Sequence, residues 1–279
     1  MLRHDSELGH WEVVLRPPTP RLRAFVGDYE GYVEAGAPPG LRQQVPATRL
    51  PLIFNFGARW HVRDSSDGSG RSELHDSFFA GLFDSSTFVA ASGPATCLEV
   101  DFTPIGAHML LGIPMHELAN RVVDIENVLP SSLAELPERL ADARSWEARF
   151  VLVDDALAAA LAGARMPSTE IVWAWNVLVR TRGRAPIGAL AERLGRSRRH
   201  LSARFREHVG LPPKAVARIL RFRRALALLE KPSPRSLAEL AFECGYYDQA
   251  HLNRDFREFA GASPGEFARR IASESGVLV

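Results

Sequence analysis

The stretch AFECGYYDQAHLNRDFREFAGASPGEF, from Ala241 to Phe267, contains two helical patterns joined by a glycine turn. A similar stretch, LAERLGRSRRHLSARFREHVGLPPKAV, runs from Leu190 to Val216. Matching residues lie 50 positions apart before the turn and 51 positions apart after it. Because the second copy stays in register after one insertion, we interpret the two stretches as an internal duplication. The residues that recur are Leu190, Ala191, Gly195, His200, Leu201, Phe205, Arg206, Glu207, Gly210, Pro213 and Arg218 in the first copy and Leu240, Ala241, Gly245, His251, Leu252, Phe256, Arg257, Glu258, Gly261, Pro264 and Arg269 in the second.

Each copy predicts a short helix, a tight turn and a second helix. Apolar residues at helical spacing bury one face of the first helix, and Gly195 permits the positive φ that a tight helix–helix turn requires. Ser197 and Asp248 are placed to cap the second helices, since their side chains can accept a backbone N–H. A leucine and a phenylalanine four residues apart then anchor each second helix, and its other face is polar. This arrangement is typical of the helix-turn-helix.

The charges of the chain are unevenly distributed, although the net charge is only +1. Residues 1–170 contain 14 Arg and no Lys against 23 Asp and Glu. Residues 171–272 contain 18 Arg and 2 Lys against 9 Asp and Glu. A strongly basic segment joined to an acidic one favours a polyanionic partner for the basic segment, here double-stranded DNA.

The outward faces of the two second helices predict contacts in the major groove, which is wide enough to accept a helix. Arginine side chains suit guanine, and glutamine or asparagine suits adenine. The alternative is an antiparallel helix pair whose charged face meets water alone. Two copies inside a basic segment favour the DNA-binding interpretation. The residues on these faces are Arg198, Arg199, Ser202 and Arg206 in the first unit and Gln249, Ala250, Asn253, Arg254 and Arg257 in the second.

The two second helices differ in charge. Ser197 to Val209 carries a net charge of +3, whereas Asp248 to Ala260 carries −1. The first unit is therefore expected to supply more electrostatic attraction to phosphates, and the second more hydrogen-bond reading of bases.

The segment GYYDQAHLNRDFREFAGASPGEFARR resembles the signature of the AraC/XylS family of bacterial transcription regulators. The resemblance covers about residues 171–272, including a helix from Pro213 to Glu230 that bridges the two units. It implies two helix-turn-helix units, at about 187–209 and 237–260, that enter neighbouring major grooves. It adds Ala203 and His251 to the expected base-reading positions. It also implies a regulator rather than an enzyme, with RNA polymerase as a further partner if the protein is an activator.

The chain before residue 125 has a different pattern. Short runs such as LPLIFNFG and TCLEVDF are rich in β-branched and aromatic residues and are separated by glycine, proline and polar residues. They predict an all-β sandwich or barrel. Helices are expected at about 105–120, 131–142 and 145–162, and the last has an apolar stripe suited to a partner, so we expect a homodimer through it. The expected fold is α+β, with a first domain at 1–165, a DNA-binding domain at 168–272 and a tail at 273–279.

In many members of the AraC/XylS family the first domain is a cupin-type barrel that binds a small effector, dimerises, or does both. The resemblance therefore implies a cupin-like domain with a small-molecule effector. The candidate pocket residues named below have a second interpretation, in which the aromatic residues belong to the hydrophobic core and the arginine faces water. No H-x-H pair occurs, so neither a metal nor another cofactor is expected. The candidate effector-pocket residues are Trp11, Arg49, Phe54, Trp60, Phe79 and Phe102.

Three classes of function are thus compatible with the sequence. The first is a DNA-binding regulator controlled by a small effector, and the second is a regulator controlled by a protein partner or by abundance. The third is implied by the resemblance, since some relatives of this DNA-binding domain are fused to alkylation-repair domains: a methyl-accepting repair protein that uses Cys97. Cys97 and Cys244 are, however, more typical of buried structural cysteines. The N-terminus lacks a basic-then-apolar leader, and no apolar run reaches about 18 residues, so a cytoplasmic protein without a membrane span is expected.

Overall fold

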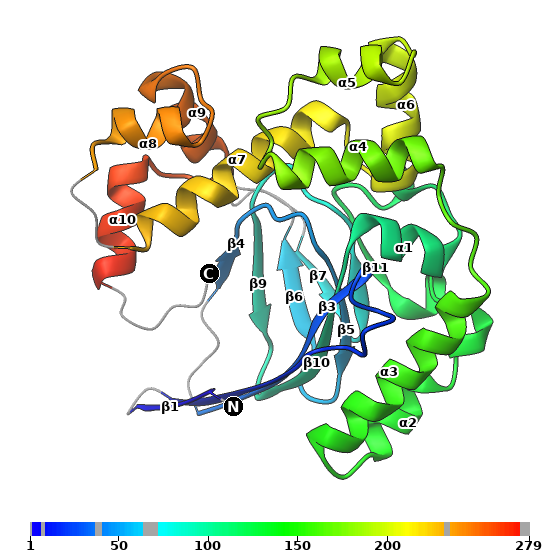
Figure 1. The fold of residues 1–279 in the computed structure, drawn as a ribbon. Helices are drawn as coiled ribbons and strands as arrows, with labels where there is room; N and C mark the ends of the chain where they lie inside the picture. The colour runs from blue at the N-terminus through cyan, green and yellow to red at the C-terminus, as the bar shows by residue number, and fades with distance from the viewer. Residues whose placement is uncertain (1, 7–8, 37–40, 64–71, 232–234, 274–279) are drawn as a thin grey trace.

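The computed structural model describes residues 2–6, 9–36, 41–63, 72–231 and 235–273 of the 279-residue chain. Two β-sheets occupy the first part of the chain, and helices form the rest (Figure 1). Beyond residue 273, the expected tail lies outside the described residues. Within the described ranges, no helix has the length and apolar character that crossing a membrane requires.

The strands form a seven-stranded and a four-stranded sheet, and all described pairs are antiparallel. The larger sheet has the order β1 (Leu2–Ser6), β2 (Gly9–Arg16), β3 (Val26–Ala35), β10 (Ala95–Phe102), β5 (Leu50–Asn55), β8 (Phe78–Ala80) and β11 (Val122–Asp124). The smaller sheet has the order β4 (Arg42–Gln44), β9 (Thr87–Ala91), β6 (Trp60–Arg63) and β7 (Ser72–His75).

Strand β10 shows why the larger sheet has two unlike faces. Leu98, Val100 and Phe102 alternate with Glu99 and Asp101, and successive side chains of a strand point to opposite faces. The three apolar residues are fully buried in the main core. The other face is directed toward the smaller sheet, across a second apolar cluster. That cluster comprises Ile53, Trp60, Val62, Phe78, Ala91, Ala95 and Cys97.

The described strands do not form the barrel that was one of the two predicted folds. The larger sheet ends at β1 and β11 and the smaller at β4 and β7, so neither sheet closes on itself. A barrel requires the first and last strands to pair. Here, two sheets face each other across an apolar layer, which is the sandwich alternative of the sequence prediction.

The first helix after the long strands is shorter than the helix that the sequence predicted at about 105–120. Helix α1 (Pro104–Leu111) ends at Gly112, whose φ of 66° is left-handed, and a 3-10 turn η1 (Met115–Glu117) follows. Two further 3-10 turns, η2 (Ile125–Asn127) and η3 (Ser131–Leu133), lead to α2 (Leu136–Asp142) and α3 (Trp146–Ala162).

The apolar stripe of α3 does not offer the free surface that the predicted homodimer requires. Phe150, Val153, Leu157 and Leu161 are buried in the chain's own core, and Phe150 stacks on Tyr29. Val151, on the outer side, is 42% exposed. The sequence pattern identified a buried face correctly, but the face packs within the chain.

The remaining helices follow the predicted order closely. They are α4 (Thr169–Arg180), α5 (Ile187–Arg193), α6 (Arg198–Val209), α7 (Pro213–Leu229), α8 (Leu237–Glu243), α9 (Gln249–Ala260) and α10 (Pro264–Ser273). One apolar cluster continues from the larger sheet through α1 and α3 into α4, α6, α7 and α9. The β-rich part and the helical part therefore pack directly against each other.

Candidate nucleic-acid interface

The turns of both helix pairs have the geometry that the sequence predicted. Gly195 and Gly245 have φ values of +62° and +81°, which L side chains adopt only with strain. The Ser197 hydroxyl accepts the His200 backbone N–H at 3.1 Å, and the Asp248 carboxylate accepts that of His251 at 2.7 Å. The predicted caps are therefore confirmed, and each second helix begins at a fixed residue.

Buried anchors fix which face of each second helix points outward. Leu201 and Phe205 of α6 are buried, as are Leu252 and Phe256 of α9. On an α-helix, residues four apart share one face, so the face opposite these anchors is left accessible. We refer to α6 and α9 as the recognition helices.

The comparisons with known proteins assign the helical part. Residues 190–270 match a family model described as a helix-turn-helix domain, and residues 15–124 match one described as a domain of unknown function, DUF6597. The chain is 38% identical over 85 residues to the HTH-type transcriptional regulator GlxA of Rhizobium meliloti (strain 1021), which is 30% of this chain and 26% of that one. It is 37% identical over 78 residues to the HTH-type transcriptional activator RhaS of Escherichia fergusonii, which is 28% of each chain.

The chain carries a DNA-binding domain of the AraC/XylS family. Its matches span only about a quarter of the length of these two relatives. Among solved structures, ToxT from Vibrio cholerae O395 aligns over 98% of this chain and 100% of its own, with 9% identity and a TM-score of 0.46.

The first unit of the AraC/XylS-type domain presents four of its five predicted DNA-contacting residues as exposed side chains. Arg198, Arg199, Ala203 and Arg206 are exposed, and Ser202 is half-buried. The Arg198 guanidinium lies close against Gly188 at the start of α5, where a Cβ would stand 2.6 Å from Nη2. The glycine therefore leaves room for the arginine at the edge of this face.

The second unit divides its predicted residues into two groups. Gln249, Ala250, Arg254 and Arg257 are exposed. His251 is half-buried, and its ring packs edge-on against the ring of Tyr246 with centroids 5.1 Å apart. Asn253 is also half-buried, and its Oδ1 is buried without a hydrogen-bond partner among the described residues. These last two side chains are thus turned partly toward the protein.

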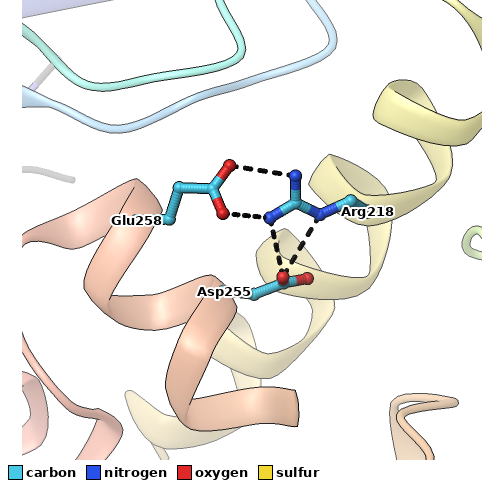
Figure 2. A network of polar contacts seen from close by, with 3 residues as sticks. All are labelled: Arg218, Asp255 and Glu258. Atoms are coloured by element: carbon cyan, nitrogen blue, oxygen red, sulfur yellow. Dashed lines mark hydrogen bonds and ion pairs between the residues drawn. The ribbon is translucent and has the colours of Figure 1, made fainter.

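Arg218 of α7 neutralises the acidic residues of α9, as Figure 2 shows. Its guanidinium donates to Asp255 Oδ1 from Nη2 at 2.8 Å and from Nε at 3.2 Å. It also donates to the two Glu258 oxygens at 2.9 and 2.5 Å. Both carboxylates raise the pKa of Arg218 further above its usual value, Glu258 more than Asp255. Since Asp248 serves as the cap, all three acidic residues of the second recognition helix have structural partners.

Two exposed aromatic residues beside α9 were not singled out from the sequence. Tyr247, in the turn before α9, is 93% exposed, and Phe242 of α8 is 84% exposed. Large aromatic side chains are usually at least partly buried, so such exposure is typical of contact surfaces. For Tyr247, its place directly before the cap Asp248, where a polar residue would suffice, is the sequence signal that could have identified it.

Both units of the domain are held by the β-rich part. In the first, His208 of α6 lies 2.9 Å from His108 of α1, between Nδ1 and Nε2. In the second, the Ser86 hydroxyl donates to the Phe259 carbonyl at 2.5 Å, and Gln43 of β4 donates to the same hydroxyl at 2.8 Å. The relative placement of the two units is therefore fixed by contacts outside the domain as well as by α7.

The candidate effector residues lie in three different places. Arg49 and Trp60 line a cavity between the two sheets. Phe54, Phe79 and Phe102 are completely buried in the main core on the other side of the larger sheet. Trp11 is half-buried on β2 and does not line this cavity. The cavity wall also contains acidic side chains that were not predicted from the sequence, namely Glu30, Glu99 and Asp101.

The described part of the chain shows no group of three or more His, Cys, Asp or Glu side chains that could hold a metal ion. Its two cysteines are both buried and unpaired. Burial raises the pKa of Cys97 well above its usual value and that of Cys244 to about 11. Both thiols are therefore protonated at neutral pH, which makes them poor nucleophiles.

Proposed function

We propose that this chain is a sequence-specific, DNA-binding transcriptional regulator that places α6 and α9 in neighbouring major grooves of one duplex. The observation that carries the proposal is the duplicated unit itself. Each copy has a capped recognition helix, buried anchors and an outward face with exposed arginines. Helix-turn-helix proteins read base edges with side chains placed in this way.

The proposal assigns the DNA contacts residue by residue. Exposed arginines at 198, 199, 206, 254 and 257 supply contacts to phosphates or guanines, and Gln249 supplies a contact to adenine. Ala203 and Ala250 leave room for close approach to bases. Ser202, His251 and Asn253 contribute after a rotation of their side chains, because they are partly buried in this structure.

We also propose that residues 1–165 form an effector-sensing part and residues 168–272 the DNA-binding part. The cavity between the sheets supports a small-molecule effector, and the contacts of α1 and of Ser86 with the recognition helices support coupling between the parts. A ligand controls DNA binding only if it prefers one arrangement of the units over another. The alternative is a regulator with the same DNA-binding domain that is controlled by a protein partner. If the protein is an activator, RNA polymerase is a further partner.

The test of DNA recognition is in-vitro selection of bound duplexes with the full chain. We expect an enriched site with two short blocks about one helical turn apart, because each unit occupies one major groove. A palindromic arrangement of such sites would indicate a dimer, which light scattering checks independently. Selection that enriches no sequence at moderate ionic strength would remove the proposal.

The methyl-accepting alternative is tested by Cys97→Ser. Cys97 is enclosed between the two sheets, and its pKa is raised by burial and by Glu99 and Glu30, so the thiol is not activated. We expect the variant to retain the DNA recognition of the parent chain. Loss of function together with methyl transfer to the parent Cys97 would favour the repair protein instead.

A further inference from the structure

A cavity of about 830 Å³ lies between the two β-sheets. Its walls come from β3, β5, β8 and β10 of the larger sheet and from β4, β6 and β9 of the smaller one. The bridging helix α7 adds Arg223 to the wall. The volume lies within the range of sites that enclose small organic molecules.

Two carboxylates face each other directly across the strands of the cavity wall. Glu99 of β10 and Glu30 of β3 are partners in the register of these antiparallel strands, and both line the cavity. Like charges directly opposite each other on a sheet are unfavourable. Burial, followed by the charges of Asp101 and Glu30, raises the pKa of Glu99 to about 8, and burial also raises the pKa of Glu30. One of these carboxyl groups therefore holds a proton at neutral pH when the cavity is empty.

Arginine side chains also line the cavity. Arg42 donates to the Tyr32 hydroxyl at 2.8 Å and forms an ion pair with Glu34. Burial raises the pKa of Asp101, and the nearby charges of Arg49 and Arg223 reduce that rise. Within the described residues, the carboxyl groups of Glu30 and Glu99 make neither a hydrogen bond nor an ion pair. A pair of enclosed carboxylates is stable only when it is protonated or when a cation is present.

Aromatic rings form much of the remaining wall. Tyr32, Trp60, Phe78, Phe83 and Phe88 all line the cavity. Such rings pack against an apolar body, and their faces attract a cation. The cavity therefore combines an acidic site with an aromatic surface.

We propose that this cavity binds a small organic amine, with a primary ammonium group held between Glu30 and Glu99 and an apolar body against the aromatic wall. The ammonium N–H groups donate to the two carboxylates, and the proton that the empty pair holds is released to solvent. As the identity of an effector, this inference rests on the proposed regulatory function. Binding of the amine itself does not require DNA.

Isothermal titration calorimetry of the full chain tests the site with benzylamine and hexylamine as probes. The neutral counterparts benzyl alcohol and hexanol have the same apolar bodies. We expect the amines to bind and to release a proton, which makes the measured heat depend on the ionisation enthalpy of the buffer. We expect the alcohols to bind at least about tenfold more weakly, since they bring no positive charge to the two carboxylates.

Three variants decide whether the carboxylate pair is responsible. Glu99→Gln and Glu30→Gln should each weaken amine binding at least about tenfold, because each removes one charge that holds the ammonium. Glu126→Gln, at an exposed position away from the cavity, is the matched control and should bind as the parent chain does. An amide at position 99 relieves repulsion, so this variant should fold, and thermal unfolding checks that it does.

Amines that fail to bind at millimolar concentration, alcohols that bind equally well, or glutamine variants that bind as the parent does would each overturn the inference. DNA selection without any amine tests the regulator separately. A chain that selects DNA but binds no amine keeps the proposed function and loses this site. A chain that binds amines but selects no DNA keeps the site and loses the regulator.

Discussion

His208 in the first recognition helix donates a hydrogen bond to His108 in α1, with 2.9 Å between Nδ1 and Nε2. The direction follows from the second contact of His108, whose Nδ1 lies 3.0 Å from the Ile113 carbonyl and must carry the proton there. Nε2 of His108 is then the acceptor. Nε2 of His208 is buried without a hydrogen-bond partner among the described residues, as expected for its unprotonated nitrogen. This histidine pair thus joins the β-rich part to the DNA-binding domain.

Low pH should weaken the contact between His208 and His108. Burial, together with the neighbouring imidazole of His108 and the charge of Arg204, lowers the pKa of His208 below its usual 6.5. The unfolded chain therefore binds more protons than the folded one below about pH 6.5, so stability is complete above that pH and falls as the pH falls. His208→Leu removes this titration and the hydrogen bond, which costs about 1 kcal/mol near neutral pH. Urea unfolding from pH 5 to 7.5 should show a flatter profile for the variant, and parallel profiles would contradict the assignment.

Glu99 should impose the opposite pH dependence. Its pKa is raised from 4.5 to about 8, so the folded chain holds a proton that the unfolded chain has lost between these values. Stability from this group is complete below about pH 4.5 and declines as the pH rises toward 8. Glu99→Gln should therefore reduce the loss of stability between pH 5 and 8, measured by urea unfolding. The control Glu126→Gln should follow the parent chain, and a Glu99→Gln profile identical to the parent would rule out an enclosed, repelled carboxylate.

Arg218 should contribute far more stability than its neighbour Arg224. Removing Arg218 leaves Asp255, which is 1% exposed, as an uncompensated buried charge. Loss of one partner of a buried pair costs about 3–5 kcal/mol. Because the Arg218 and Glu258 side chains are partly exposed, we expect Arg218→Ala to lower the free energy of unfolding by about 3 kcal/mol. Arg224→Ala, on the same helix, breaks a half-exposed pair with Glu243 and should cost at most about 1 kcal/mol. Similar losses for the two variants would contradict this account.

The features that could be predicted from the sequence depend on neighbours along the chain. Gly195, Ser197 and Asp248 are each determined by residues within one helical turn, so the turns and caps were found. Arg218 and Asp255 are 37 residues apart, and their pairing needs the packing of α7 on α9. The acidic wall was missed for the same reason. The alternation in TCLEVDF shows that Glu99 shares a face with Asp101, but only the register with β3 places Glu30 opposite it.

The sequence left a sandwich and a barrel open, and the described strands form no closed barrel, because closure of a sheet is decided by strands far apart in sequence. Short strands with regular turns are equally compatible with two packed sheets. Likewise, the stripe of α3 has the pattern of a partner-binding helix, but Phe150 and Tyr29 meet inside one chain. Amphipathic periodicity identifies a buried face without identifying what covers it.

The two recognition helices should differ in the salt dependence of DNA binding, but less than their net charges of +3 and −1 suggest. Arg218 neutralises Asp255 and Glu258, so α9 retains exposed positive charge at Arg254 and Arg257. A lost phosphate contact lowers the slope of log K against log salt by about 0.9. We expect Arg199→Ala to produce a change of this size in a fluorescence-anisotropy titration on the selected site. Asn253→Ala should leave the slope unchanged, because its side chain is uncharged and partly buried. Equal slopes for the two variants would show that Arg199 does not meet a phosphate.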